Sequence, residues 1–538
     1  MKGVGKDYIE LQELGSSTGS NESDTGSDWE SDSGDRAWFN EVITSINEWL
    51  NERNSKHQRI VEWSYVVLSV CIMRLVFASL VFPNQEIQLI GCGDTDVIWK
   101  GRMDECGVLG EKCIDKFASH EKIKVRCPAF CRNGGKAWDV IRYANKTIQY
   151  EPFLIHGTSY QNEDIVYRAD SFPCMAGIEL GYVSELWGGS IELNLNDSWN
   201  KSEEFDADFP ASFLIKPLKG GHDLFIAGIF TGIILSLGAA FLVFNEVLFY
   251  FTIFGIVYTT VVLCGDSPVE VSDLDSSLDL ISIWIQRLVP LTSLVWLVRG
   301  KYKTLASRIT WIIGLWITSL DNLTFEQLPI DRLVWNDIKN EKGGVVAVLG
   351  VFVLVLTCAV YQAWILYLEG KLMRYVINYS IGLIVFIIIG NLHSSGLTLR
   401  IHHWVIGLVL VWGCRETPPS STLLHGLCLG LIINGIGRWG FASLLEPTVQ
   451  VSRDHQDITV PKPNIDIDII SGNYTLNGFE SCQIYVNDIL FSRNCVGDGI
   501  DINDRYVRAW ACIQGDHCRW SDTVVLTNLP RAEHDEMR

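Results

Sequence analysis

Long apolar runs that are almost free of charge dominate the middle of the chain. A run of roughly 20 such residues matches the thickness of the hydrocarbon core of a bilayer. The first run lies at 61–82, and the double-length stretch 224–264 is broken at Asn245-Glu246, which predicts two spans joined by a hairpin. The pattern predicts a polytopic α-helical membrane protein with about nine spans, eight of them in a membrane domain at 224–445. The six remaining runs are 281–298, 309–320, 345–368, 375–392, 397–413 and 423–445.

Basic residues beside the runs predict the orientation. Arg53, Lys56 and Arg59 precede the first span, and loops rich in Lys and Arg stay in the cytosol. The N-terminus is therefore expected in the cytosol and residues 83–222 in the lumen or outside the cell. Nine spans then leave the C-terminus on that same outer side. The pattern fits either the plasma membrane or an endomembrane such as the vacuole, Golgi or endosome.

The segment before the first span divides into two parts. Residues 1–35 are rich in Ser, Gly, Asp and Glu, too poor in apolar surface to offset the entropy of ordering, so a disordered cytosolic tail is expected. Because this opening is polar and acidic, the first span is expected to act as the targeting signal. Apolar residues then recur at helical spacing from Trp38, which predicts an amphipathic juxtamembrane helix at 36–59.

Two segments outside the membrane are expected to fold as soluble domains, at 90–215 and 446–530. Disulfides persist in the lumen and outside the cell, and both segments contain cysteines. The later segment alternates polar and apolar residues as β-strands do and contains an even set, Cys482, Cys495, Cys512 and Cys518. Glycosylation sequons are expected to be used on this side, at Asn145, Asn196, Asn200 and Asn473.

The stretch Cys127-Pro-Ala-Phe-Cys131 could hold a metal, carry redox chemistry or form disulfides. A structural zinc site would need a second close pair of ligands, and the segment has only one close cysteine pair. Disulfides are therefore expected. The six cysteines allow fifteen pairings, and spacing alone does not choose among them; they are Cys92, Cys106, Cys113, Cys127, Cys131 and Cys174.

The same segment resembles the LCCL domain. The resemblance rests on "RCPAFC" at 126–131, "AWDVIRY" at 137–143 and "YRADSFPCMAGIELGYVSELWGG" at 167–189. It implies an α+β fold in which sheet flanks a central helix, and Asp170 or Ser171 could cap a helix through 175–183. Glu179 stands where that family often has His. The pairing implied by the resemblance is Cys131 with Cys174, Cys127 with Cys113, and Cys92 with Cys106.

Further stretches resemble the multi-spanning LCCL-domain membrane proteins of fungi. They include "LDNLTFEQLPIDRL" at 320–333 and "GLCLGLIINGIGRWGFASLL" at 426–445. "CQIYVNDILF" resembles the tail of that group, which implies a β-sandwich-like, fibronectin-III-like domain. The resemblance implies that the outside domain binds a lipid or glycan ligand, as a receptor would.

Polar residues inside predicted spans are candidate functional residues because burying them in lipid is costly. Asn434 and Arg438 are four residues apart and share a helix face. One hypothesis is a pocket for an anionic lipid headgroup, since the forked donors of arginine suit phosphate. The alternative is that these side chains snorkel or pair with Asp321 or Glu446. The candidates are Arg74, Arg287, Arg400, Asn434 and Arg438.

Three histidines are expected at the outer ends of the spans, His393, His402 and His403. Three histidines would satisfy zinc and leave a position open for water. Adjacent helical residues point about 100° apart, so His402 and His403 could share a metal only if the helix begins after them. The alternative is that they are interfacial histidines that form hydrogen bonds.

Composition narrows the function further. The net charge of −20 argues against nucleic acid as a partner, because phosphate binding needs basic patches. No nucleophile elbow, phosphate-binding loop or dinucleotide fingerprint occurs, so no catalysis and no cofactor are expected, and membrane lipids are the expected surroundings. The alternative function is a metal-dependent membrane enzyme that acts on lipid headgroups through the outer histidines and arginines. A transporter is less favoured because no inverted repeat is visible.

Overall fold

A computed structural model describes most of residues 55–526, which fall into two compact units at Ile60/Val61. Of the first unit only Ser55–Ile60 is described, so the predicted tail at 1–35 and most of the helix at 36–59 lie outside the described residues. Everything below concerns the second unit. The gaps within 55–526 are 82–86, 96–121, 132–134, 158–164, 195–211, 219–224, 264–273, 301, 303, 322–324, 326–327, 331, 392–396, 417, 455, 469–470, 501–505 and 514–516.

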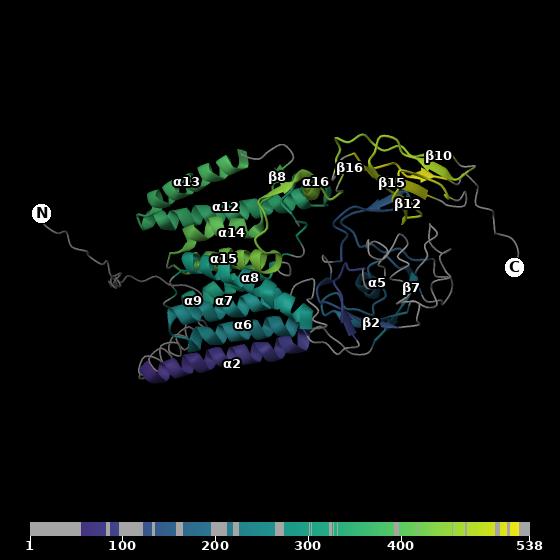
Figure 1. The fold of residues 1–538 in the computed structure, drawn as a ribbon. Helices are drawn as coiled ribbons and strands as arrows, with labels where there is room; N and C mark the ends of the chain where they lie inside the picture. The colour runs from purple at the N-terminus through teal and green to yellow at the C-terminus, as the bar shows by residue number, and fades with distance from the viewer. Residues whose placement is uncertain are drawn as a thin grey trace, which may run out of the picture. The chain divides into compact units, whose positions relative to one another are not determined.

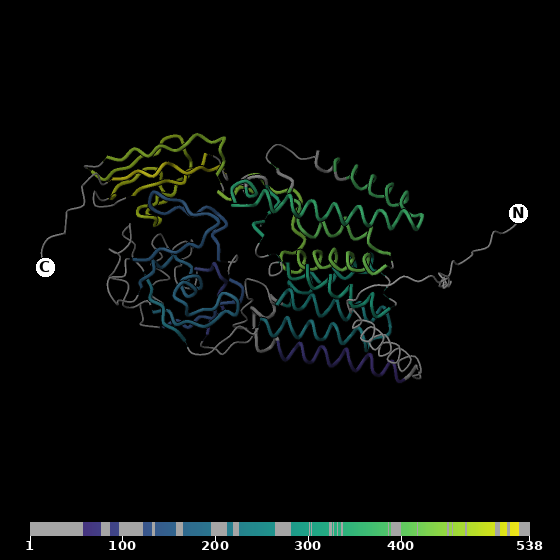
Figure 2. Tube along the Cα trace, turned by 180° about the vertical axis from the view of Figure 1, so that it is seen from behind, coloured from purple at the N-terminus to yellow at the C-terminus, as the bar shows by residue number. Residues whose placement is uncertain are grey.

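Nine helices overlap the nine predicted spans, with different bounds in several cases, and lie side by side (Figures 1 and 2). Among the described residues, five of them are long and apolar enough to cross a membrane: α6, α7, α12, α15 and the Ile281–Val298 part of α8. The number of spans and their sidedness stay predictions. The helices are α2 (Ser55–Val81), α6 (Phe225–Leu242), α7 (Glu246–Leu263), α8 (Leu274–Val298), α9 (Leu305–Ser319), α12 (Gly344–Leu368), α13 (Leu372–Asn391), α14 (His403–Val411) and α15 (Pro419–Trp439).

Glycines let α9 and α15 approach to backbone contact. A Cβ on Gly426 would lie 2.3 Å from the carbonyl oxygen of Trp311, and a Cβ on Gly314 would lie 2.4 Å from that of Leu423. Small residues at such crossings replace side-chain packing by close backbone packing. The two helices thereby form the centre of the helical core, where Trp311 is fully buried.

The predicted eighth span is corrected at its start. Residues Leu397–Leu399 form strand β8, which pairs with β9 (Leu445–Pro447) in antiparallel register. Helix α14 begins only at His403 and continues as a short 3-10 turn, η4 (Trp412–Cys414). The apolar run was longer than the helix because β9, a strand from beyond α15, satisfies the backbone of its first residues.

The first module is built on a five-stranded sheet in the order β1-β2-β6-β7-β5. Helix α5 (Pro173–Glu179) packs on it, and a separate hairpin pairs β3 with β4. Tyr167, Ile191 and Phe213 are fully buried in its core. The strands are β1 (Ile87–Leu89), β2 (Ile123–Cys127), β3 (Ile141–Tyr143), β4 (Lys146–Ile148), β5 (Val166–Arg168), β6 (Gly189–Asn194) and β7 (Ser212–Pro217).

The disulfides of this module differ from the implied pairing. Cys131 bonds to Cys92 rather than Cys174, and Cys127 bonds to Cys174 rather than Cys113. The reason is topological: β2 carries Cys127 into the sheet beside α5, whereas Cys131 follows a turn that brings it to the end of β1. Cys106 and Cys113 lie outside the described residues.

The predicted helix cap is also corrected. Helix α5 starts at Pro173 with Phe172 as its N-cap, and no side chain caps it. Ser171 instead accepts from the backbone N–H of Ile155 and donates to the Ile155 carbonyl. Asp170 pairs with Arg168. Proline at the first helical position needs no N–H partner, so the side chains of Asp170 and Ser171 are available for tertiary contacts.

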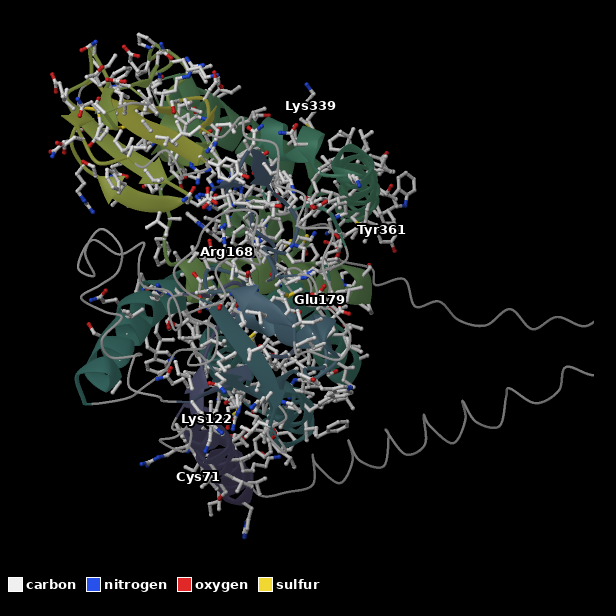
Figure 3. All side chains as sticks on the ribbon, turned by 90° about the vertical axis from the view of Figure 1, so that its right-hand side faces the viewer. Cys71, Lys122, Arg168, Glu179, Lys339 and Tyr361 are labelled. Carbon is white, nitrogen blue, oxygen red and sulfur yellow. A yellow bond between two sulfur atoms is a disulfide. The ribbon has the colours of Figure 1, made fainter. Side chains whose placement is uncertain are left out.

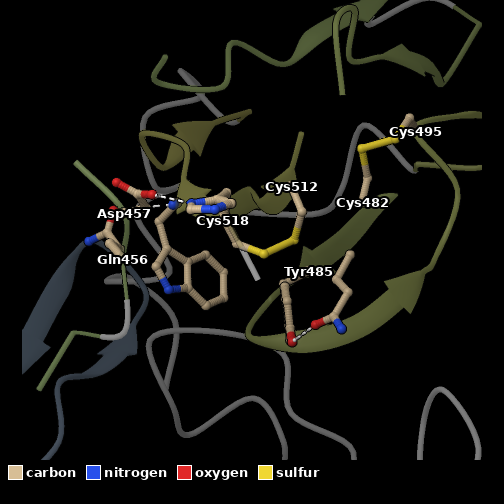
Figure 4. The surroundings of a disulfide bond; sticks show 10 residues. Gln456, Asp457, Cys482, Tyr485, Cys495, Cys512 and Cys518 are labelled. Carbon is tan, nitrogen blue, oxygen red and sulfur yellow. Dashed lines mark hydrogen bonds and ion pairs between the residues drawn. A yellow bond between two sulfur atoms is a disulfide. The ribbon is translucent and has the colours of Figure 1, made fainter. Parts of the chain in front are cut away.

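The tail module consists of two antiparallel sheets around one buried core. The larger sheet follows the order β13-β12-β15-β16, with β17 added beside β15, and the smaller follows β10-β11-β14. Cys482 bonds to Cys495 and Cys512 to Cys518 (Figure 4). The strands are β10 (Asp466–Asp468), β11 (Asn473–Thr475), β12 (Ser481–Val486), β13 (Ile489–Ser492), β14 (Val496–Gly497), β15 (Tyr506–Cys512), β16 (Cys518–Trp520) and β17 (Val524–Val525).

Candidate functional site

The polar residues predicted inside spans are only partly brought together. Arg287 of α8 donates through Nη1 to the carbonyl oxygens of Gly437 and Arg438, at 2.9 and 2.8 Å. These are among the last carbonyls of α15, which lack partners within the helix, and a cation there complements the helix dipole. Arg287 therefore caps α15.

Asn434 of α15 bridges to the end of α9. Its Nδ2 donates to the Ser319 carbonyl at 2.8 Å, and its buried Oδ1 has no hydrogen-bond partner among the described residues. On the same helix, the Arg438 guanidinium lies over the Trp439 ring at 5.4 Å. Arg74 lies exposed on α2, and Figure 1 shows α6 and α7 between α2 and α15.

His402 and His403 lie near different carboxylates. His402 is the N-cap of α14; its Nε2 lies 3.0 Å from the Ser443 carbonyl and 3.5 Å from Glu446. The Nδ1 of His403 lies 3.2 Å from Asp321 Oδ2. Glu446 also pairs with Arg400 at 2.9 Å. This last pair matches the hypothesis that the arginines pair with nearby carboxylates.

The arrangement gives no grouped metal ligands. Within the described ranges, no group of three or more His, Cys, Asp or Glu side chains could hold a metal ion, and His393 lies outside those ranges. The His403–Asp321 pair is a carboxylate that orients an imidazole, with Asp321 Oδ1 buried and unpartnered among the described residues. Such a pair can hold one tautomer of the imidazole, as a positioned general base requires.

A buried charge network that the sequence did not reveal joins the first module to the tail. Arg168 is 1% exposed and forms a bidentate pair with Asp170 at 2.7 and 2.8 Å. Its Nη1 donates at 3.0 Å to Asp488, in the turn between β12 and β13. Asp488 also pairs with Arg508 of β15 at 3.1 Å. Figure 3 shows Arg168 in the packed region where the two modules meet.

Burial and nearby charges shift the pKa values of Arg168 and Arg508 in opposite directions. Burial by itself lowers the pKa of Arg168, but Asp170 and Asp488 outweigh it and raise that pKa above its usual value. Burial also lowers the pKa of Arg508, and there it prevails over the attraction of Asp488. Buried charges are tolerated when they are paired and hydrogen-bonded, so Asp488 is the residue on which both cations depend.

A second set of contacts ties the first module to the segment before α12. Asp337, in helix α11 (Trp335–Asn340), accepts from Tyr150 Oη at 3.1 Å and Arg332 Nε at 2.8 Å. Burial and the Asp337 charge raise the pKa of Tyr150. Arg453, just after helix α16 (Thr448–Val451), lies 3.5 Å from Asp337. Lys136 pairs with Glu341 at 3.2 Å.

The Cys127–Cys131 stretch is the joint between the first module and the helices. Phe130 has a φ of 59°, unusual for a non-glycine residue. Its ring meets that of Phe225, the first residue of α6, with centroids 6.4 Å apart. Ala129 is buried in the core formed by the helices. The two flanking disulfides hold this turn in place.

Comparison with known proteins identifies one relative without a described function. The chain is 28% identical over 457 residues to the uncharacterized protein YIL067C of Saccharomyces cerevisiae. The match covers 76% of this chain and 66% of that protein, so the chain spans just under two thirds of the relative's length. No described protein family matches the chain, and no solved structure matches it.

Proposed function

We propose that this protein is a multi-spanning membrane protein that binds a lipid or glycan outside the membrane, as a receptor does, through its two disulfide-bonded modules. In this proposal the first module is an LCCL domain and the tail is fibronectin-III-like. The N-terminus is cytosolic, and both modules are lumenal or extracellular. The proposed ligand class, a lipid or glycan, comes from the resemblance of "RCPAFC" and its neighbours to the LCCL domain.

Exposed apolar helices support the membrane part of the proposal. Val346 and Phe352 of α12 are 75% and 61% exposed, and the apolar surface continues around that helix. In water such a surface would be unfavourable by about 25 cal/mol per Å². Lipid tails remove that cost, so α12 and α13 are proposed to face the hydrocarbon.

The observation that carries the binding function is the network of Arg168, Asp170, Asp488 and Arg508. Four buried charges from two modules hold those modules in one arrangement. A surface built from both would be preorganised, and preorganisation reduces the entropy lost on binding.

Co-purification tests the proposal directly. The full chain, purified in mild detergent, would be examined by lipid mass spectrometry and on an array of oligosaccharides. A lipid or glycan enriched over an unrelated multi-spanning protein is expected. Enrichment of neither class would overturn the binding function.

A second candidate function is a membrane enzyme acting on lipid headgroups, and the His403–Asp321 pair is the observation that favours it. In that proposal His403 is the general base and Asp321 orients it. Turnover of phospholipid vesicles by the purified protein, lost in His403→Ala and kept in His402→Ala, is the expected result. Absence of turnover, together with no bound zinc or iron, would exclude this alternative.

A further inference from the structure

Three aromatic side chains lie on the face of the larger tail sheet that points away from its core, beside Arg508 of the buried charge network. Trp510 of β15 and Trp520 of β16 are direct cross-strand partners, and Tyr485 lies on β12. Side chains alternate between the faces of a strand, so these positions face away from the core that holds Ile484 and Ala509. Each of these three residues is partly exposed.

The rings form a continuous strip. The Trp510 and Trp520 centroids are 5.1 Å apart and those of Tyr485 and Trp520 are 5.2 Å apart, with ring planes inclined by 49° and 50°. The guanidinium groups of Arg142 and Arg508 each lie 5.4 Å from the Trp520 centroid. These cation–π contacts fix the central ring, so the strip is twisted and rigid.

Amide and carboxylate groups border the strip. Tyr485 donates to Gln483 Oε1 at 2.7 Å (Figure 4). Gln456 accepts from the Trp520 backbone N–H at 3.2 Å and donates to Asp454. Asp454 in turn pairs with Arg142. Hydrogen-bonding groups therefore lie beside the aromatic strip.

Local charge indicates what kind of ligand fits. Three arginines and three aspartates surround the strip and its junction with the first module, so the region has no surplus charge to attract an anion. They are Arg142, Arg168, Arg508, Asp170, Asp454 and Asp488. An anionic lipid headgroup would meet no net positive field from these six residues.

We propose that the strip of Tyr485, Trp510 and Trp520 binds a neutral hexose oligosaccharide. A pyranose ring offers an apolar face of C–H groups to an aromatic ring and a rim of hydroxyls to amides and carboxylates. The inference rests on the proposed ligand-binding function and narrows it from a lipid or glycan to a neutral glycan.

The test uses the full chain in detergent with mannotriose, an N-acetylglucosamine tetramer and a β-glucan hexamer as probes. Binding is followed by calorimetry and by tryptophan fluorescence. At least one probe is expected to bind, with the affinity at least tenfold weaker in Trp510→Ala and largely retained in Trp510→Phe. Trp187→Ala is the matched control, because Trp187 is an exposed tryptophan of the first module, and unchanged binding is expected. Unchanged thermal midpoints show that the variants are folded.

Each other outcome has a defined meaning. A probe that binds wild type and Trp510→Ala equally overturns the strip as the site and leaves the proposed function standing. Binding of phosphatidylserine vesicles but no oligosaccharide also overturns the strip and leaves the function in its lipid form. Binding of neither oligosaccharides nor vesicles overturns both the strip as a site and the proposed function.

The sequon residue Asn145 lies exposed in the β3–β4 turn. Binding that appears only in Asn145→Gln would mean that the chain's own glycan fills the strip, which overturns a separate ligand.

Discussion

At the scale of single residues, Asp488 has two roles, one in a local turn and one in contacts with residues far away in the sequence. The sequence indicates only the first. Asn487 and Asp488 have φ of 48° and 71°, as a two-residue hairpin turn needs, and Asn and Asp tolerate this conformation. The "ND" pair therefore predicts a turn. The same carboxylate also accepts from Ala144 N and from Arg168, which lie 344 and 320 residues away in the sequence. No local pattern indicates partners at that separation.

Substituting Asp488 is expected to destabilise both modules. In Asp488→Asn, Arg508 loses its carboxylate and Arg168 loses one of two. Breaking a buried ion pair by removing one partner costs about 3–5 kcal/mol. Thermal unfolding of the purified chain measures the loss. Asp522→Asn is the control, because Asp522 pairs with Lys462 at the surface and such pairs contribute about 0–1 kcal/mol. Equal midpoints in the two variants would contradict the role of Asp488.

Asp457 is expected to make the tail sensitive to acid. Hydrogen bonds from Thr459 and His517 lower the pKa of Asp457 to about 2, against about 3.9 in an unfolded chain. A lowered pKa stabilises the fold above the unfolded value and loses that contribution as pH falls through the folded value. The midpoint of wild type should therefore fall more steeply than that of Asp457→Asn between about pH 4 and 2. If the unfolding midpoints of wild type and Asp457→Asn fell in parallel with pH, this role of Asp457 would be contradicted.

At the scale of elements, hydrophobic periodicity located the helices but not their ends or their neighbours. The runs at 224–264 and 345–368 match α6, α7 and α12 closely because long apolar runs have few other stable conformations in lipid. The prediction of a helix over 397–413 was wrong at its start, because Leu397–Leu399 forms β8, which pairs with β9. The predicted disulfide partners were wrong for a similar reason, because Cys131 is close to Cys92 only once β1 and β2 are paired.

The crossing of α9 and α15 gives a matched pair of glycine substitutions. In Gly426→Ala the new Cβ meets the Trp311 carbonyl, so the helices must separate, and about 1–3 kcal/mol of stability should be lost. Gly255 of α7 has no other atom within 4 Å of such a Cβ, so Gly255→Ala should be neutral or slightly stabilising. Thermal stability of the detergent-purified variants distinguishes them. Tolerance of Gly426→Ala would mean that the crossing adjusts freely.

At the scale of the whole molecule, the candidate site was only half visible in the sequence. The sequence singled out Arg287 and Asn434 as candidates because they are polar residues in apolar runs. Their partners are backbone carbonyls of neighbouring helices, which a sequence does not place. The aromatic strip was equally hidden, because Tyr485, Trp510 and Trp520 meet only after the strands pair.

The proposed orientation is tested by the sequons. Asn145 and Asn473 are both exposed at the surface of their modules. If both modules face the lumen or the cell exterior, each site carries a glycan. With four sequons expected to be used on this side, removal by an endoglycosidase should increase the gel mobility of wild type by four steps, and that of Asn145→Gln or Asn473→Gln by one step fewer. Absence of a shift at both sites would place the modules on the cytosolic side.

The junction at Arg168 also sets an order of events during synthesis. Its counter-ion Asp488 follows 320 residues later, which at 5–20 residues per second is a delay of roughly 16–64 s. Until then the first module holds a cation whose pairing is incomplete, and its final stability depends on a segment made 320 residues later. A chain truncated before Asp488 is thus expected to leave Arg168 without this counter-ion, and its first module should be less stable than in the full chain.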